Sequence, residues 1–227
     1  MPDFTIDSRD RQGNTPLLWS VLQGRDDLLC RLINLGADVN EQNFKGDSAI
    51  HMAVRSGNLN AIFILGQSGA AINMRGPCGE TCLHQAAAFG NETMIRLLLK
   101  LGAHLNAKDE VGDTPLHWAI REGRENVVGL FLHYGVDINA KNIDGETPLF
   151  LAISAKESKI AHMLIIKGAN VSDMDCCGVS MIQEAKLSGN SNIATSLENH
   201  GAVMSKNQIA IGFGTIPTTQ FNSYLQV

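Results

Sequence analysis

Apolar, glycine and small residues recur along this chain with a period of 33 residues. Glycine marks the period, leucine or isoleucine lies four residues after each of these glycines, and alanine or serine lies seven residues after. A second glycine follows after twenty-three residues and precedes alanine or valine each time. The marking residues, which we call the phase glycines, are Gly13, Gly46, Gly79, Gly112, Gly145 and Gly178. Six copies in one phase predict an array of similar units that pack on their neighbours.

The fourth unit shows which elements the pattern predicts. Thr114 has a hydroxyl that can cap a helix, and Pro115 suits the first helical position, where no N–H is needed. Gly123 is expected to end this helix, and a second apolar stripe predicts another helix over about residues 125–134. Gly135 then allows the left-handed exit that helices favour. Each unit therefore reads as two short helices followed by an extended hairpin loop.

The segment TPLHWA at residues 114–119 resembles the T-P-L-H-x-A signature of the ankyrin repeat. The resemblance implies an all-α ankyrin-repeat solenoid of stacked helix-turn-helix units with hairpin loops. We expect a lead-in over residues 1–8, six repeats over residues 9–203, and an extended C-terminal tail over residues 204–227.

Composition narrows the function classes. The chain has 227 residues and a formal net charge of -5, which argues against direct binding to nucleic acid. The sequence lacks an apolar run of membrane-helix length, a signal peptide and a recognisable catalytic motif. Five irregularly spaced cysteines are typical of a reducing compartment. We therefore expect a cytoplasmic, monomeric, non-catalytic protein without a cofactor.

Histidine and cysteine are the candidate metal ligands in this sequence. His51, His84 and His117 recur in phase, but units stacked about 8–10 Å apart hold them too far from one another to share an ion. The ankyrin resemblance gives this histidine a structural role, bonding to the turn and to the next unit. The pairs Cys78–Cys82 and Cys176–Cys177 lie three units apart, so no metal site is expected.

The residues free to vary on the hairpin tips and on the first helices of repeats 2 to 4, which line the concave face, are the candidate partner-binding surface. Aromatic residues and arginine are typical interface anchors, and an apolar residue at a hairpin tip has little structural purpose. Packing between units is the alternative for Trp118 and the other residues of its phase. The candidates are Phe44, Arg55, Phe89, Val111, Asp113, Trp118, Arg121, Glu122 and Ile143.

An acidic or amide residue follows five of the six phase glycines, as in Asp47, Glu80, Asp113 and Glu146. With Glu110 and Asp144 this stripe is expected to form an acidic ridge on the hairpin edge of repeats 2 to 5. Two interpretations stay open. Carboxylates near helix N-termini are favoured by the helix dipole, and an exposed ridge would attract a basic peptide or protein surface.

Asn40, eight residues after Leu32, resembles the hairpin asparagines that ankyrin-directed asparaginyl hydroxylases modify. A turn-stabilising asparagine is the alternative.

Two short segments, residues 2–10 and 75–84, are similar to the endosomal ankyrin proteins that end in a FYVE zinc finger. That resemblance implies a scaffold or adaptor in endosomal membrane traffic that serves small GTPases, although the FYVE cysteines are absent from this chain. A regulatory ankyrin subunit of an enzyme or transcription-factor complex is the alternative function.

Overall fold

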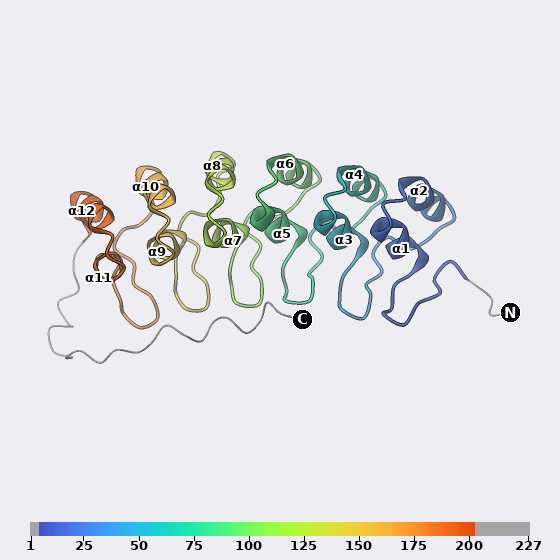
Figure 1. Cartoon of the computed structure of the whole chain (residues 1–227), viewed down its shortest axis with the longest axis horizontal. Helices are drawn as coiled ribbons and strands as arrows, with labels where there is room; N and C mark the ends of the chain where they lie inside the picture. The colour runs from blue at the N-terminus through green and yellow to red at the C-terminus, as the bar shows by residue number, and fades with distance from the viewer. Residues whose placement is uncertain (1–4, 203–227) are drawn as a thin grey trace.

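The computed structural model describes residues 5–202, and these residues form twelve α-helices in six pairs (Figure 1). The first helices of the pairs are α1 (Pro16–Leu22), α3 (Ala49–Arg55), α5 (Cys82–Phe89), α7 (Pro115–Arg121), α9 (Pro148–Ser154) and α11 (Met181–Leu187). The second helices are α2 (Asp26–Asn34), α4 (Leu59–Gln67), α6 (Glu92–Lys100), α8 (Glu125–His133), α10 (Ser158–Ile166) and α12 (Ser191–Asn199). The predicted all-α repeat solenoid is confirmed.

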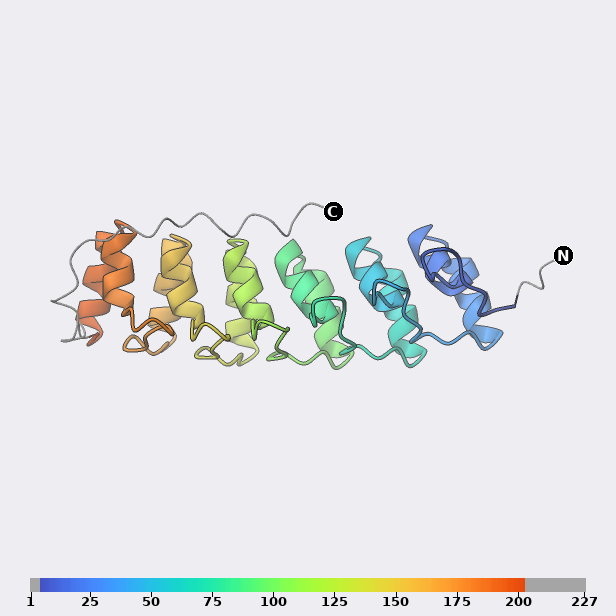
Figure 2. The ribbon, with the colours of Figure 1, turned by 90° about the horizontal axis from the view of Figure 1, so that it is seen from below.

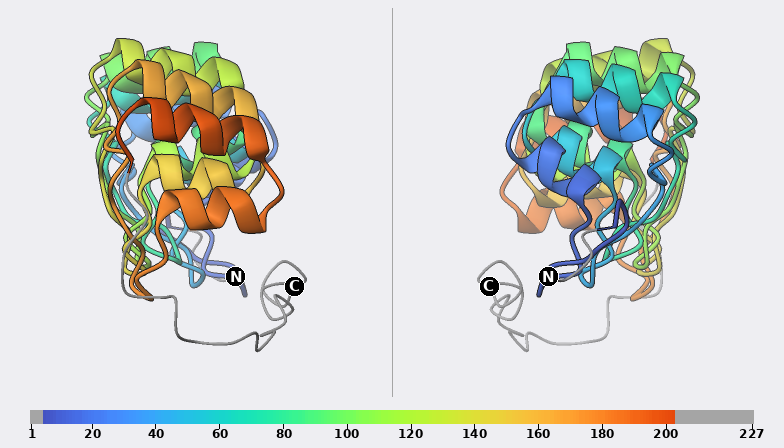
Figure 3. Two further views of the ribbon diagram at one scale, coloured as in Figure 1. Left: turned by 90° about the vertical axis from the view of Figure 1, so that its left-hand side faces the viewer. Right: turned by 90° about the vertical axis from the view of Figure 1, so that its right-hand side faces the viewer.

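The pairs stand side by side in an elongated row. Each first helix packs on the first helix of the next pair, and each second helix packs on the next second helix. Figure 2 shows the pairs following one another along the row. The loops between pairs project to one side, below the first helices, as the end views in Figure 3 show. We call these five loops, together with the equivalent loop before α1, fingers 1 to 6, and each contains one phase glycine.

The first helices begin as predicted, and the in-phase histidine takes part in the cap. The Thr114 hydroxyl and backbone N–H both bond to Nδ1 of His117, at 2.8 and 3.1 Å, which forms a capping box. Because Nδ1 accepts the backbone N–H, the neutral ring carries its proton on Nε2. Gln183 forms the same kind of box with Ser180 in α11, so the substitution of glutamine for histidine preserves the cap.

The core is one continuous cluster that runs through all six pairs. Leucine or isoleucine four residues after each phase glycine is buried throughout, as in Leu83, Leu116 and Leu149. Small residues such as Ala86 and Ala119 are also fully buried and let neighbouring helices approach closely. One helix pair cannot bury both of its faces, so most of the burial depends on the adjacent pairs.

Left-handed backbone positions fall where glycine was predicted to end helices. Gly123 and Gly135 have φ angles of 62° and 76°. Lys156 takes the position in the fifth pair that glycine occupies in the others, with a φ of 62°. A side chain in this region costs about 1–2 kcal/mol, so this turn is more strained than its equivalents.

The last described pair carries charge where the others have apolar residues. Lys186 and Glu198 form an ion pair of 3.3 Å between α11 and α12. The predicted tail, residues 204–227, lies outside the described residues. Ile6 of the predicted lead-in packs against the core.

Candidate protein-interaction surface

Each finger is shaped by a carboxylate or amide at its base. In finger 4, Oδ1 of Asp109 accepts the backbone N–H groups of Val111 and Asp113, at 3.0 and 2.9 Å. Within the described residues, backbone bonds join adjacent fingers except fingers 2 and 3, as where Ile143 N–H donates to the Val111 carbonyl at 3.0 Å. The tips are therefore held in fixed positions before any partner arrives.

Apolar side chains at the tips face solvent. Phe44 is 73% exposed, Ile143 is 67% exposed, and Val111 is 46% exposed. Phe44 lies across Gly13, where a Cβ atom would stand only 2.6 Å from the phenyl ring. A glycine at position 13 is thus needed for this close approach, and the ring is supported along one face while the other stays open.

Arg55 and Arg121 lie at the C-terminal ends of α3 and α7, and each is held by the aspartate that follows the phase glycine. Arg55 contacts both carboxylate oxygens of Asp47, with Nη1–Oδ1 and Nη2–Oδ2 distances of 2.7 and 2.6 Å. Arg121 Nη1 lies 2.8 Å from Oδ2 of Asp113 in an ionic contact without hydrogen-bond alignment. Both guanidinium groups remain substantially exposed on their other edge.

Aromatic residues accompany these arginines. Phe89 ends α5 and is 52% exposed. Trp118 is half-buried: its ring centroid lies 5.5 Å from that of His84, and its Nε1 donates to Asp109 Oδ2 at 2.9 Å. Trp118 therefore contributes to the packing between units, the alternative considered for it, and still presents part of its ring.

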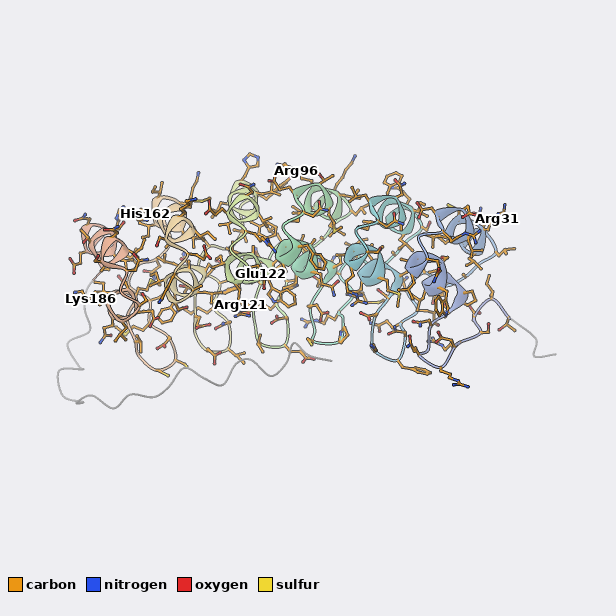
Figure 4. All side chains as sticks on the ribbon, in the orientation of Figure 1. Arg31, Arg96, Arg121, Glu122, His162 and Lys186 are labelled. Atoms are coloured by element: carbon orange, nitrogen blue, oxygen red, sulfur yellow. The ribbon has the colours of Figure 1, made fainter. Side chains whose placement is uncertain are left out.

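Figure 4 shows Arg121 and Glu122 at the C-terminal end of α7, whereas the labelled Arg96 and His162 lie on the second helices. Glu122 is exposed beside Arg121. The candidate residues thus come from fingers 2, 4 and 5 and from the ends of α3, α5 and α7, on the finger side of the row.

The expected acidic ridge is only partly present, because Glu110 and Asp144 are exposed whereas residues of the stripe after the phase glycines are buried. Asp47 and Glu80 are buried, and Asp113 is 0% exposed, so Asp113 cannot contact a partner as predicted. The Asp113 side chain turns inward because Asn142 Nδ2 donates to its Oδ1 at 3.0 Å while Arg121 pairs with its Oδ2. The carboxylates join the fingers to the helices, and the exposed partner of each pair is the arginine.

Asn40 has a structural role that recurs along the row. Its Oδ1 accepts the Ala71 N–H at 2.7 Å, and its Nδ2 donates to the Gly69 carbonyl at 3.3 Å. Asn73 makes the equivalent pair of bonds to the next repeat. These bonds support the turn-stabilising alternative, and hydroxylation of Asn40 remains a prediction.

The histidines bond as expected in two of the three cases. Nε2 of His84 donates to the Asp113 carbonyl at 3.0 Å, and Nε2 of His117 donates to the Glu146 carbonyl at 3.3 Å. His51 Nε2 has no hydrogen-bond partner among the described residues. Burial lowers the pKa of all three imidazoles below the usual value of 6.5.

The cysteines do not form a cluster. Cys82 is buried, burial raises the pKa of its thiol to about 12, and its Sγ donates to the Ile72 carbonyl. Cys78, Cys176 and Cys177 are exposed free thiols. Within residues 5–202, no three His, Cys, Asp or Glu side chains are grouped so that they could hold a metal ion.

Sequence reasoning missed two contributors to this side of the molecule. Arg124 donates from Nε to the Ala88 carbonyl at 2.7 Å and lies over Gly90, so it ties the start of α8 to the end of α5. Lys108 donates to the Lys141 carbonyl of the next finger at 2.7 Å. The repeat pattern gave no signal for either residue, since glycine at position 90 recurs in phase and its φ of 76° already accounts for it.

Comparison with known proteins identifies the class. A family model described as ankyrin repeats (3 copies) matches residues 2–76 and 50–142, and a model of the single ankyrin repeat matches residues 144–176. The chain belongs to the ankyrin-repeat family. Ankyrin repeats are protein–protein interaction modules, and proteins built from them are typically non-catalytic.

Mouse (Mus musculus) inversin is a curated relative that matches over a short stretch. The two are 42% identical over 52 residues, which is 23% of this chain and 5% of inversin. The chain thus spans only a small part of the relative's length. The comparisons do not support the narrower resemblance to the FYVE-type endosomal ankyrin proteins. None of the helices between residues 5 and 202 has both the length and the apolar character needed to cross a bilayer.

Proposed function

We propose that this chain is a scaffold that binds a partner protein across fingers 2 to 5 and the ends of α3, α5 and α7. The observation that carries the proposal is the row of exposed apolar side chains on rigid supports: Phe44, Phe89, Val111 and Ile143. Exposed aromatic and aliphatic groups on preorganised elements lose little conformational entropy when they bind, which favours affinity.

Burial of the acidic residues changes the expected partner. The sequence favoured a basic peptide because of the acidic stripe, but Asp47 and Asp113 are turned inward. The exposed charged groups near these buried aspartates are the guanidinium groups of Arg55 and Arg121 and the carboxylate of Glu122. The surface is therefore mixed in charge and apolar at its tips, and a protein surface of complementary character suits it better than a uniformly basic one.

Service to small GTPases in endosomal traffic is a narrower hypothesis. It rests on the two short segments at residues 2–10 and 75–84 alone. Colocalisation of the tagged full chain with an early-endosome marker tests it independently of the surface.

The surface itself is tested by comparing two triple variants of the full chain in a quantitative pull-down. The first, Phe44→Ser/Phe89→Ala/Ile143→Ser, removes the finger-side apolar groups. The control, Leu35→Ser/Ile166→Ser/Tyr134→Ser, removes comparably exposed apolar groups from the ends of the second helices. Circular dichroism verifies that both remain folded.

We expect the finger-side variant to lose the partners that the wild-type chain captures, and the control to keep them. Loss in the control alone, or equal capture by both variants, would contradict the proposed surface.

A further inference from the structure

We propose that the ends of α3, α5 and α7 recognise an extended acidic segment of the partner, with two carboxylates bound by Arg55 and Arg121 and an apolar side chain on Phe89 between them. We call these three residues the Arg–Phe–Arg row. The inference rests on the proposed function, because it specifies the ligand of part of the same surface.

Only the cationic half of each ion pair is accessible. The Asp47 side chain is 7% exposed and that of Asp113 is 0% exposed, whereas those of Arg55 and Arg121 are 40% and 50% exposed. A partner that approaches this face meets two guanidinium edges with free N–H donors. Carboxylates accept such donors in short, charge-assisted hydrogen bonds.

Each arginine is also held in place before binding. The Asp47 carboxylate contacts both terminal nitrogens of Arg55, and Asp113 holds Arg121 from the buried side. A guanidinium group fixed in this way has less rotamer freedom to lose when a partner binds. The aspartates thus act as positioning residues for the arginines.

The pairing of aspartate with arginine is confined to repeats 2 and 4, so the fold does not require it. The same two positions, one and nine residues after the phase glycine, hold other combinations in the remaining repeats. These are Asn14 with Leu22, Glu80 with Ala88, Glu146 with Ser154, and Val179 with Leu187. Aspartate occurs only where there is an arginine to hold, which points to a function for the arginines outside the packing.

The spacing defines the ligand. Arg55 and Arg121 stand two repeats apart, which is about 20 Å at the usual distance between packed helices. An extended segment in the polyproline II conformation advances about 3.1 Å per residue and returns to the same face every third residue, so this distance corresponds to about six residues. Phe89 stands on the intervening helix. The expected segment carries acidic residues at its first and seventh positions and an apolar residue at the fourth. Because Glu122 is exposed beside Arg121, a further acidic residue beyond the seventh position is disfavoured.

Selection from a displayed library of random linear peptides, followed by fluorescence polarisation with the enriched sequences, tests the inference on the full chain. Replacing an arginine alone would leave a buried aspartate without its cation, so each pair is changed together. The two paired variants are Asp47→Asn/Arg55→Leu and Asp113→Asn/Arg121→Leu. They introduce the residues that repeat 1 has at these positions, Asn14 and Leu22. There, Asn43 Nδ2 donates to the Asn14 amide oxygen at 3.0 Å without any arginine, so both variants are expected to fold.

We expect the wild-type chain to enrich acidic–apolar–acidic peptides, and each paired variant to bind them at least tenfold more weakly, as the loss of one charged hydrogen bond implies. Phe89→Ala should weaken binding as well. Replacing both acidic residues of the peptide by lysine should abolish its binding to the wild-type chain.

Enrichment of basic peptides, or no enrichment, would overturn the inference. So would equally tight binding of a single-stranded oligonucleotide, since simple attraction of polyanions would then explain the result. None of these results would decide the broader proposal that the finger side binds a partner protein. That proposal is tested separately, by the pull-down with the finger-side and control variants.

Discussion

Two neighbouring junctions, between repeats 2 and 3 and between repeats 3 and 4, follow the same repeat pattern. They differ in the hydrogen bonds that cross them. At the second of these, Glu110 N–H donates to the Cys78 carbonyl and His84 bonds to the Asp113 carbonyl. At the first, position 77 is a proline, which has no N–H to donate, and His51 Nε2 is unpartnered within the described residues.

The base of finger 3 differs as well. Gly76 stands where finger 4 has Asp109, and the missing carboxylate is supplied by Glu80, whose Oε2 accepts the Cys78 N–H at 2.8 Å. A Cβ atom on Gly76 would lie 2.6 Å from Glu80 Oε1, so the glutamate fills the space that the glycine leaves. Finger 3 thus keeps its shape with Glu80 in place of an aspartate, while two of the bonds that would join it to repeat 2 are missing.

The largest expected effect is on the free energy of unfolding, and it differs between two histidines at equivalent positions, His84 and His51. His84→Ala removes the acceptor for Thr81 N–H, the bond to the next repeat and a fully buried ring, so we expect a loss of about 3 kcal/mol. His51→Ala removes a similar ring without the bond between repeats, so its loss should be smaller by about 1 kcal/mol. Urea denaturation measures both, and an equal or larger loss for His51→Ala would break the comparison.

Acid should act through the same histidines. Burial lowers their pKa in the folded chain below 6.5, so the unfolded chain binds more protons and stability falls as the pH drops below about 6.5. The slope is at most about 1.4 kcal/mol per histidine for each pH unit. His84→Gln, which copies Gln183, should keep the cap and flatten the profile of the melting temperature between pH 7.5 and 5. An unchanged profile would exclude His84 as a source of this dependence.

The base of finger 3 provides a double-mutant test. Gly76→Asp alone should destabilise the chain by about 1–2 kcal/mol, because its carboxylate would crowd that of Glu80. Adding Glu80→Asp, which reproduces the Asp109–Asp113 arrangement, should recover most of the loss. Additive effects in thermal denaturation would show that the two positions do not compensate each other.

Pro77→Ala is expected to have the smallest effect. It supplies an N–H that can donate to the Lys45 carbonyl, by analogy with Glu110 and Cys78. The gain is offset by greater freedom of the unfolded chain, so the net change should lie within about 0.5 kcal/mol. Slower hydrogen exchange of the new amide at position 77 would confirm the bond, and exchange as fast as in an exposed loop would exclude it.

The sequence predicted the parts of this fold that depend on spacing. The period of the phase glycines, the Thr114–Pro115 helix start and the exit at Gly135 follow from local rules, and each agrees with the structure. The exposed tips at Phe44 and Ile143 were also predictable, because no packing position in the period calls for them.

The direction of the Asp113 side chain could not be predicted from spacing. A carboxylate after a loop glycine looks exposed in the sequence, and only the positions of Asn142 and Arg121 turn it inward. The sequence also did not reveal that Glu80 supplies the carboxylate that Gly76 lacks. Like the direction of Asp113, this depends on contacts between side chains, which the 33-residue spacing does not specify.

The claim that bonds between repeats hold the array together is tested most directly by native-state hydrogen exchange of the full chain, read by mass spectrometry. We expect α1 to α4 to exchange as one block, through an opening at the junction of repeats 2 and 3 that costs less free energy than the opening of α5 to α10. Exchange of all these helices in a single global step, or earlier opening between repeats 3 and 4, would contradict the claim.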